Sequence, residues 1–256
     1  MATYEIYNSE IYSLFKSNID FLFENRDCKK ELNCALNMNI ILLNACYLEG
    51  LFERNAKCIL GYHRSIYKNV SIPDLNFRRP MNIFYNRITS DLKRKISQTS
   101  GIDNYDTLFE ILLGKSMKKD EAIKPLIEPI KVLFQLRNVI AHGREITAYE
   151  VSAYWTSGAN EEHFEGGYKK AEDLLLKNNL LDKKYVEQQD VSLFFTNNIA
   201  DYFYNTMTEF IAQLDLFINH NLEIPDKIYD DISTYNKTYG TEYDLMEYFE
   251  MRGNMV

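Results

Sequence analysis

Glycine and proline, the residues that most often interrupt helices, are scarce in this sequence of 256 residues, which has ten glycines and five prolines. Cysteine is scarce as well. Its four copies contain no C-x-x-C pair and lie at Cys28, Cys34, Cys46 and Cys58. These gaps of six and twelve residues fit one face of a helix better than a metal site or a disulfide framework. We therefore predict long helices, reduced cysteines that pack as small core residues, and no metal site.

Positive charge is also in short supply. There are 29 Lys and Arg residues against 37 Asp and Glu, which gives a formal net charge of -8. This balance argues against a surface that binds nucleic acid everywhere, but it leaves room for a local basic groove. The start of the chain lacks the basic region and apolar core of a signal peptide, and no apolar run reaches membrane-spanning length. We expect a cytoplasmic protein with no membrane partner.

Hydrophobic side chains are abundant, at 46% of the residues, and they recur with helical spacing. The sequence therefore predicts an all-α bundle of long antiparallel helices. One core stripe repeats at four-residue steps through Phe84, Ile88, Leu92 and Ile96. The expected helices cover residues 3–25, 30–60 with a stop at Gly61, 81–96 after a loop from Val70 to Pro80, 106–113, a segment ending at His142, 168–177 and 191–219.

The organisation of the chain is predicted from the same pattern. Residues 1–220 form one helical domain, and residues 144–166, which contain the only tryptophan, form an irregular insertion in it. Residues 221–256 form a C-terminal extension that packs on the bundle or trails from it. A small helix is expected there, with Thr241 and Asp244 as a capping pair.

One run in the middle of the chain, QLRNVIAHG from Gln135 to Gly143, brings together a cation, an amide and an imidazole. Asn138 and His142 are four residues apart and face the same side of a helix. Arg137 is rotated from His142 by roughly 140° but is long enough to reach around the helix. The three side chains can therefore converge on one anion at the end of the helix, which Gly143 is expected to terminate.

Arg137 also falls on an apolar stripe with Ile130, Leu133 and Ile140. A cation in that position must be paired, in contact with water, or turned toward another subunit. The simplest solution is a polar cleft that opens at this face of the helix.

These side chains suit the cleavage of RNA. Arginine offers a planar, permanently charged fork that fits a phosphate, and it stabilises the charge that builds in the transition state. A histidine that titrates near neutral pH can take the proton of the ribose 2′-OH or protonate the 5′-oxygen leaving group. This chemistry needs no metal and no cofactor, and DNA should survive because it lacks the 2′-OH.

The string R-N-x-x-x-H, late in an all-helical chain, resembles the R-x4-6-H signature of HEPN domains, in which a polar residue, often Asn, follows the Arg. The resemblance implies a helical bundle that forms a homodimer with a composite cleft. It also implies a metal-independent endoribonuclease of a toxin–antitoxin, abortive-infection or other anti-phage system, with an antitoxin or regulatory protein as a possible partner. His142 would then act as acid or base, Arg137 as phosphate clamp and Asn138 as positioning donor. The sequence departs from family members with H-x-Y, whose Tyr a partner nucleotidyltransferase modifies, because Arg144 occupies that position.

Two further features support this interpretation. The resemblance implies that an acidic residue on an early helix contacts the motif arginine, and Glu49 is the candidate; the alternative is a partly exposed side chain beside Gly50. The segment from Phe77 to Lys95 has one acid, Asp91, and is a candidate RNA-binding surface. Its cations are Arg78, Arg79, Arg87, Lys93, Arg94 and Lys95. The alternative is an ordinary exposed helix face.

Two other readings of the whole chain remain. In the first, the chain is a catalytically silent HEPN-like scaffold or regulatory module that binds RNA or a partner protein. In the second, it is a purely structural helical module, in which His142 favours the negative end of its helix dipole and Arg137 pairs with a buried Glu. The predicted loss of RNA cleavage in His142→Ala and Arg137→Ala separates these readings from the nuclease.

Overall fold

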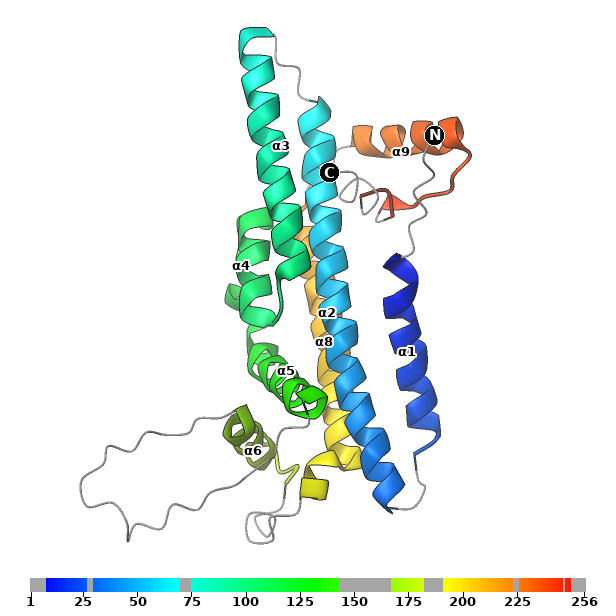
Figure 1. The fold of residues 1–256 in the computed structure, drawn as a ribbon, viewed down its shortest axis with the longest axis vertical. Helices are drawn as coiled ribbons and strands as arrows, with labels where there is room; N and C mark the ends of the chain where they lie inside the picture. Colours follow the sequence, from blue (N-terminus) through cyan, green and yellow to red (C-terminus); the bar gives the residue numbers. More distant parts are fainter. Residues whose placement is uncertain are drawn as a thin grey trace, which may run out of the picture. The chain divides into compact units, whose positions relative to one another are not determined.

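The computed structural model describes residues 8–26, 30–69, 75–142, 167–181, 191–222, 226–245 and 247–249. Within these ranges the backbone is helical or connects helices, and no residue belongs to a strand. The all-α prediction is therefore confirmed (Figure 1). The predicted insertion at residues 144–166 lies outside the described residues.

The helices, with the 3-10 turns between them, are distributed along the whole chain. They are α1 (Asn8–Glu24), α2 (Lys30–Asn69), α3 (Leu75–Gln98), α4 (Ile102–Leu113), η1 (Met117–Lys119), η2 (Lys124–Leu126), α5 (Ile127–His142), α6 (Gly167–Lys177), η3 (Val191–Phe195), α8 (Asn197–Asn221) and α9 (Asp226–Tyr239).

The chain divides into two compact units. Unit 1 comprises residues 1–12, 48–125 and 211–256, and unit 2 comprises residues 13–47 and 126–210. Both α2 and α8 therefore contribute residues to each unit. The division of the sequence into residues 1–220 and 221–256 stays a prediction.

The core of unit 1 is aromatic. The ring of Phe52 in α2 stacks on that of Tyr105 in α4, with centroids 4.7 Å apart, and the Phe109 ring is tilted by 60° to that of Phe52 at 6.0 Å. All three side chains are almost fully buried. Burial of such large side chains contributes about 1.5–3 kcal/mol each, which fixes α4 against the second half of α2.

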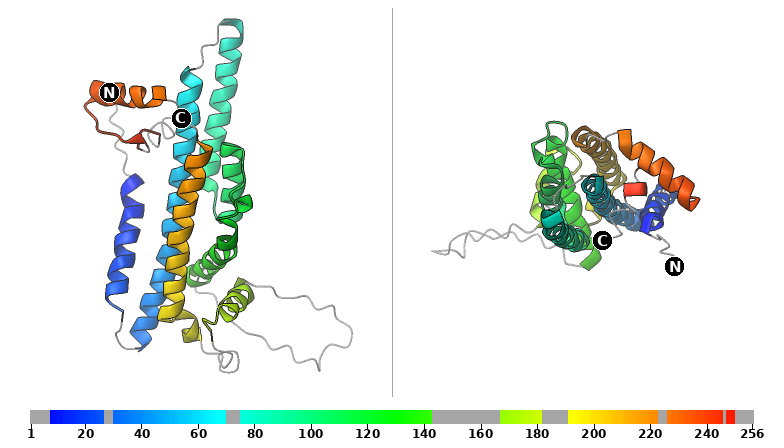
Figure 2. Two further views of the ribbon diagram at one scale, coloured as in Figure 1. Left: turned by 180° about the vertical axis from the view of Figure 1, so that it is seen from behind. Right: turned by 90° about the horizontal axis from the view of Figure 1, so that it is seen from above.

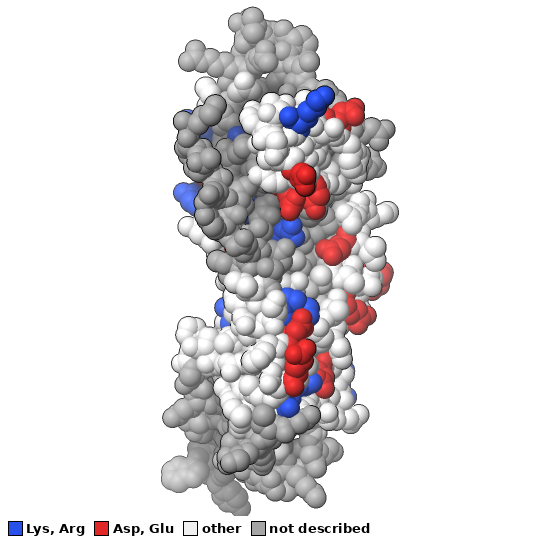
Figure 3. Space-filling model, turned by 90° about the vertical axis from the view of Figure 1, so that its right-hand side faces the viewer, with Lys and Arg blue, Asp and Glu red and all other residues white. Residues whose placement is uncertain are grey.

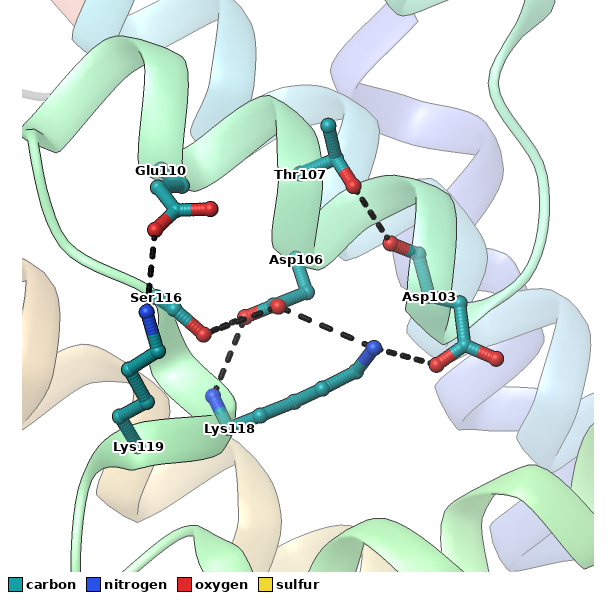
Figure 4. A network of polar contacts seen from close by, with 7 residues as sticks. All are labelled: Asp103, Asp106, Thr107, Glu110, Ser116, Lys118 and Lys119. Carbon is teal, nitrogen blue, oxygen red and sulfur yellow. Dashed lines mark hydrogen bonds and ion pairs between the residues drawn. The ribbon is translucent and has the colours of Figure 1, made fainter.

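The end of α4 is fixed by a polar network (Figure 4). Gly114 adopts a left-handed conformation, with φ of 73°, and its N–H donates to the carbonyl of Glu110, so the end of the helix predicted over 106–113 is confirmed. Beyond it, the buried carboxylate of Asp106 accepts hydrogen bonds from the Ser116 hydroxyl and the Lys118 backbone N–H. The ammonium of Lys118 also pairs with Asp103.

In unit 2, α1 and the first half of α2 run antiparallel, whereas α8 runs parallel to α2 (Figures 1 and 2). The predicted antiparallel arrangement thus holds for the first pair and not for the second. Arg26 fixes the end of α1 to α8 through an ion pair of 2.7 Å with Asp201. The core contains Ile19, Ile40, Leu133, Leu175 and Phe203, all without exposed surface. Helix α5 packs against α6 in this unit.

The predicted helix boundaries at Gly61 and Pro80 were wrong, and the helix predicted to begin at residue 106 begins at Ile102. Gly61 does not end α2 but lies buried inside it, between the buried Leu60 and Tyr62. Packing on both sides outweighs the cost of about 1 kcal/mol for an interior glycine. Pro80 is the sixth residue of α3 rather than the end of a loop. Proline already has a helical φ. The hydrogen bond that it removes, to the carbonyl four residues earlier, lies near the start of the helix.

The predicted helix over 191–219 is interrupted at Thr196, where η3 ends and α8 begins. The Asn37 amide of α2 donates to the Phe195 carbonyl and to the Asn197 Oδ1, both at 2.9 Å. These bonds stabilise the interruption. Spacing within the segment could not reveal it, because the side chain responsible belongs to a distant helix.

The predicted capping pair Thr241–Asp244 was also wrong. Asp244 and Glu247 instead cap each other: the Glu247 N–H donates to the Asp244 carboxylate at 2.8 Å, and the Asp244 N–H donates to that of Glu247 at 3.0 Å. Thr241 donates to the side-chain oxygen of Asn236. The capping residue is therefore three positions later than expected, although the motif is of the expected kind.

The predicted core stripe on α3 is buried only in part. Ile96 is 1% exposed, whereas Phe84 is 60% and Ile88 is 40% exposed. The first half of the stripe therefore faces away from the core of unit 1. Four-residue spacing identifies the apolar face of a helix but not how far its partner extends.

One stretch of α2, Leu32–Arg64, is long and apolar enough to cross a membrane by length and composition, with a mean hydropathy of 1.3 over its most apolar window. This differs from the expectation that no apolar run reaches that length. A core helix passes the same test, and 44% of that window is buried inside the protein.

Candidate functional site

Helix α5 carries the motif in unit 2. It begins directly after η2, and Pro129 is its third residue, where the missing N–H costs nothing. Glu128 lies in its first turn, where a carboxylate suits the helix dipole, and His142 lies in its last. Fully buried Ile130 and Leu133 anchor the helix in the core. The predicted helix ending at His142 is thus present; Gly143, its predicted stop, lies outside the described residues.

Arg137 lies where the buried face of α5 leaves the core. Ile130 and Leu133, two turns and one turn earlier, have no exposed surface, whereas Arg137 and Ile140 are half-buried. The guanidinium carbon lies 5.7 Å from the centroid of the Phe134 ring, which offers it a cation–π contact. The Arg137 stem therefore packs against the helix while part of the side chain reaches solvent. Contact with water is one of the three environments expected for a cation on an apolar stripe.

Asn138 and His142 are both exposed. Their four-residue separation places them on one face of α5, one turn apart. Arg137 precedes Asn138 directly. The last two turns of α5 thus present a guanidinium, an amide and an imidazole, and the amide and the imidazole belong to exposed residues.

Glu49 belongs to unit 1, whereas Arg137 belongs to unit 2. The Glu49 side chain is half-buried, and its backbone carbonyl accepts a hydrogen bond of 3.5 Å from the Tyr105 hydroxyl. The idea that Glu49 orients the motif arginine stays a prediction.

The predicted RNA-binding segment lies on α3, in unit 1. Arg87 and Arg94 are exposed, and Arg94 pairs with Asp91 at 3.1 Å with both side chains more than two thirds exposed. Such a pair contributes little and leaves the cation accessible. Arg78 and Arg79 belong to the first turns of α3, but their side chains lie outside the described part of the structure.

A cationic cluster that the sequence did not reveal lies between α2 and α3. Burial lowers the pKa of Lys93, and the positive charges of Lys57 and Arg64 lower it further. Lys57 also pairs with Glu53 at 2.9 Å. The basic surface therefore includes residues of α2 as well as α3. Only their proximity in space identifies them, since Lys57 and Lys93 are far apart in the sequence.

Charge elsewhere is mixed. On the face drawn in Figure 3, the basic side chains of the described residues are interspersed with acidic ones and form no continuous positive surface. Among the described residues, no group of three or more His, Cys, Asp or Glu is placed to hold a metal ion.

Comparison of the chain with protein-family models, with curated proteins and with solved structures finds no match. The HEPN resemblance therefore depends on the motif and on the helical fold, and stays a prediction.

Proposed function

We propose that this protein is a metal-independent endoribonuclease of the HEPN type that acts as a homodimer, as a toxin or an anti-phage effector. The observation that carries the proposal is the accessible end of α5, where Asn138 and His142 are exposed on one face and Arg137 emerges from the core beside them. In the homodimer the two α5 ends form one composite cleft.

The reaction is a transesterification within the RNA. The 2′-oxygen attacks the neighbouring phosphorus, a new P–O2′ bond forms, and the P–O5′ bond breaks. His142 takes the proton from the 2′-OH or delivers one to the departing 5′-oxygen. Arg137 holds the non-bridging oxygens as negative charge accumulates, and Asn138 donates a hydrogen bond that positions the phosphate.

The test is cleavage of a labelled RNA by the full-length protein, with and without EDTA. We expect fragments that end in 2′,3′-cyclic phosphate in both conditions, and no cleavage when the nucleotide at the cut site is 2′-deoxy. His142→Ala should abolish cleavage. His220→Ala is the matched control, because His220 is also exposed in the last turn of a helix, α8.

Two results would refute the enzyme: wild-type protein that cuts no RNA and is harmless when overexpressed, or a His142→Ala variant that cuts as fast as wild type. Melting curves of each variant should match wild type, because substitution of an exposed side chain changes stability by about 0.5 kcal/mol or less. Light scattering gives the mass that tests the dimer.

A second candidate, a scaffold or regulatory module without catalysis, is favoured by the surface of α3. Four large apolar side chains are exposed there between 40% and 60%, at Met81, Ile83, Phe84 and Ile88. Clustered exposed apolar side chains are typical of interaction surfaces. If this candidate is correct, Phe84→Ser should prevent assembly with a partner. Neither the wild type nor His142→Ala should cleave RNA.

A further inference from the structure

A pocket of about 460 Å³ opens in unit 2 where η3 meets α8. Its lining combines two residues of α2 with the interruption that precedes α8, and includes Asn33, Cys34, Ser192, Phe195, Thr196 and Asn197. None of the described lining residues is charged. A pocket of this size accommodates a small ligand, and a neutral lining favours a neutral one.

The amides of the pocket are held in a fixed orientation. Asn33 and Asn37 each donate a side-chain N–H to the Oδ1 of Asn197, at 2.9 Å. Asn37 donates to the Phe195 carbonyl as well. Both amide nitrogens are therefore engaged, and of the two residues only Asn33 lines the pocket.

Three buried oxygens have no hydrogen-bond partner among the described residues. Asn33 Oδ1 and Thr196 Oγ1 belong to residues that line the pocket. The third, Asn37 Oδ1, belongs to a residue behind the lining, whose amide nitrogen bonds to the lining residues Phe195 and Asn197. A buried polar atom without a partner costs free energy, and native structures rarely contain several together. A ligand that donates to Asn33 Oδ1 and forms a hydrogen bond with the Thr196 hydroxyl would remove part of this cost.

Thr196 is especially informative. It directly precedes α8, and its carbonyl accepts the first hydrogen bond of that helix, from the Ala200 N–H at 3.1 Å. A threonine in this place normally turns its hydroxyl to cap the helix. Here the hydroxyl makes no such bond within the described residues. It is therefore available to donate to, or accept from, a bound molecule.

We propose that this pocket binds a nucleobase that carries an exocyclic amino group beside a ring nitrogen, as adenine and cytosine do. The amino group donates to the Asn33 amide oxygen, and the Thr196 hydroxyl donates to the ring nitrogen beside it. Asparagine side chains recognise adenine edges by the same kind of hydrogen bond. The choice of a nucleobase over other neutral ligands rests on the proposed action on RNA; the base comes from that RNA or from a free nucleotide.

Binding is tested without cleavage, by titration of the full-length protein with adenosine, cytidine and purine riboside, which lacks the amino group. We expect adenosine or cytidine to bind at least about tenfold more tightly than purine riboside, the factor expected for one lost hydrogen bond of about 1.4 kcal/mol. His142→Ala should bind as wild type does, so that loss of the nuclease and loss of the pocket are distinguished.

Thr196→Val removes only the hydroxyl and keeps the side-chain shape, and Asn33→Ala removes one amide oxygen. Each should weaken adenosine or cytidine binding about tenfold or more. Asn44→Ala is the matched control, because Asn44 is a buried asparagine of the same helix and unit that does not line the pocket. If no nucleoside binds, or if Thr196→Val and Asn33→Ala bind as wild type does, the proposal is overturned.

The source of the base follows from the same variants. If it belongs to the RNA, Thr196→Val should flatten the preference for cleavage next to adenine or cytosine. If it belongs to a free nucleotide, the cleavage preference should be unchanged while adenosine or cytidine binding is lost. Both results support the proposal, because each requires that the pocket bind the hydrogen-bonding edge of the base.

Discussion

The hydroxyl oxygen of Ser116 lies 2.9 Å from both carboxylate oxygens of Asp106, which is ten residues earlier in the chain. Asp106 is 7% exposed and also accepts the Lys118 backbone N–H at 3.1 Å. The carboxylate therefore supplies partners to two polar groups of the turn that follows α4. This arrangement makes Asp106 a structural residue of unit 1, although a buried acid beside a serine and a lysine has the composition of a catalytic site.

Asp106→Ala should lower the free energy of unfolding by about 2–3 kcal/mol, because the variant leaves the buried Ser116 hydroxyl and the Lys118 N–H without their acceptor. The measurement is urea denaturation. Asp103→Ala is the control: Asp103 is exposed and pairs with the Lys118 ammonium, a surface interaction of about 1 kcal/mol or less. Equal effects of the two substitutions would contradict the structural role.

The helices were predictable because their signals are local. Apolar residues at three- and four-residue steps identified the helical segments, and the stop at Gly114 follows from its freedom to adopt a left-handed conformation. The position of the motif at the end of α5 was predictable for the same reason. Arg137, Asn138 and His142 are close in sequence, so the helix alone determines how they are placed.

Features that depend on distant residues were not predictable. The interruption at Thr196 requires the amide of Asn37, about 160 residues earlier, as the hydrogen bond to Asn197 shows. The cations of α2 beside Lys93 are likewise a result of packing. Gly61 was misread because a glycine that ends a helix and one that packs inside it have the same sequence signal.

Asn37 and Asn44 lie two turns apart on α2 and both have no exposed surface, but they should respond in opposite ways to replacement by leucine. Asn37→Leu loses the bonds to Phe195 and Asn197 and should lower the free energy of unfolding by about 2–3 kcal/mol. Asn44 has neither amide atom bonded among the described residues, so Asn44→Leu should be neutral or stabilising. Thermal and urea unfolding of both variants measure the difference, and a large loss in Asn44→Leu would contradict it.

Arg137→Met and Arg137→Lys separate the charge of this side chain from its shape. Methionine keeps the apolar stem but removes the charge, and should lower kcat by about 10²–10³-fold. Lysine keeps a charge but not the planar fork, and should restore only part of that loss.

The control for Arg137 is Arg87→Ala on α3, which should raise KM and reduce the salt dependence of binding while kcat stays near wild type. Single-turnover cleavage of one RNA by all three variants makes the comparison. An unchanged kcat in Arg137→Met would remove Arg137 from the proposed mechanism.

Lys93 gives a prediction about pH. Burial lowers its pKa, with further contributions from the positive charges of Lys57 and Arg64, so the charged form is disfavoured in the folded protein. Below the lowered pKa, Lys93 is charged in both the folded and the unfolded protein, so the full cost of burying its charge lowers the free energy of unfolding. Between that pKa and the ordinary lysine value, the unfolded chain holds more protons than the folded one, so the Lys93 contribution to the free energy of unfolding rises with pH.

Lys93→Met keeps most of the stem and removes the charge. It should therefore be more stable than wild type at pH 7, and this advantage should shrink as the pH rises through the lowered pKa of Lys93, where the wild-type side chain loses its proton. Added salt should also shrink it, because salt screens the repulsion from Lys57 and Arg64. Lys95→Met, an exposed position of the same helix, is the control and should show neither trend. The measurement is urea unfolding of these variants at several pH values. If the stability difference between wild type and Lys93→Met does not change with pH, the Lys93 charge does not destabilise the folded protein. In that case the three cations are not held together at the junction of α2 and α3.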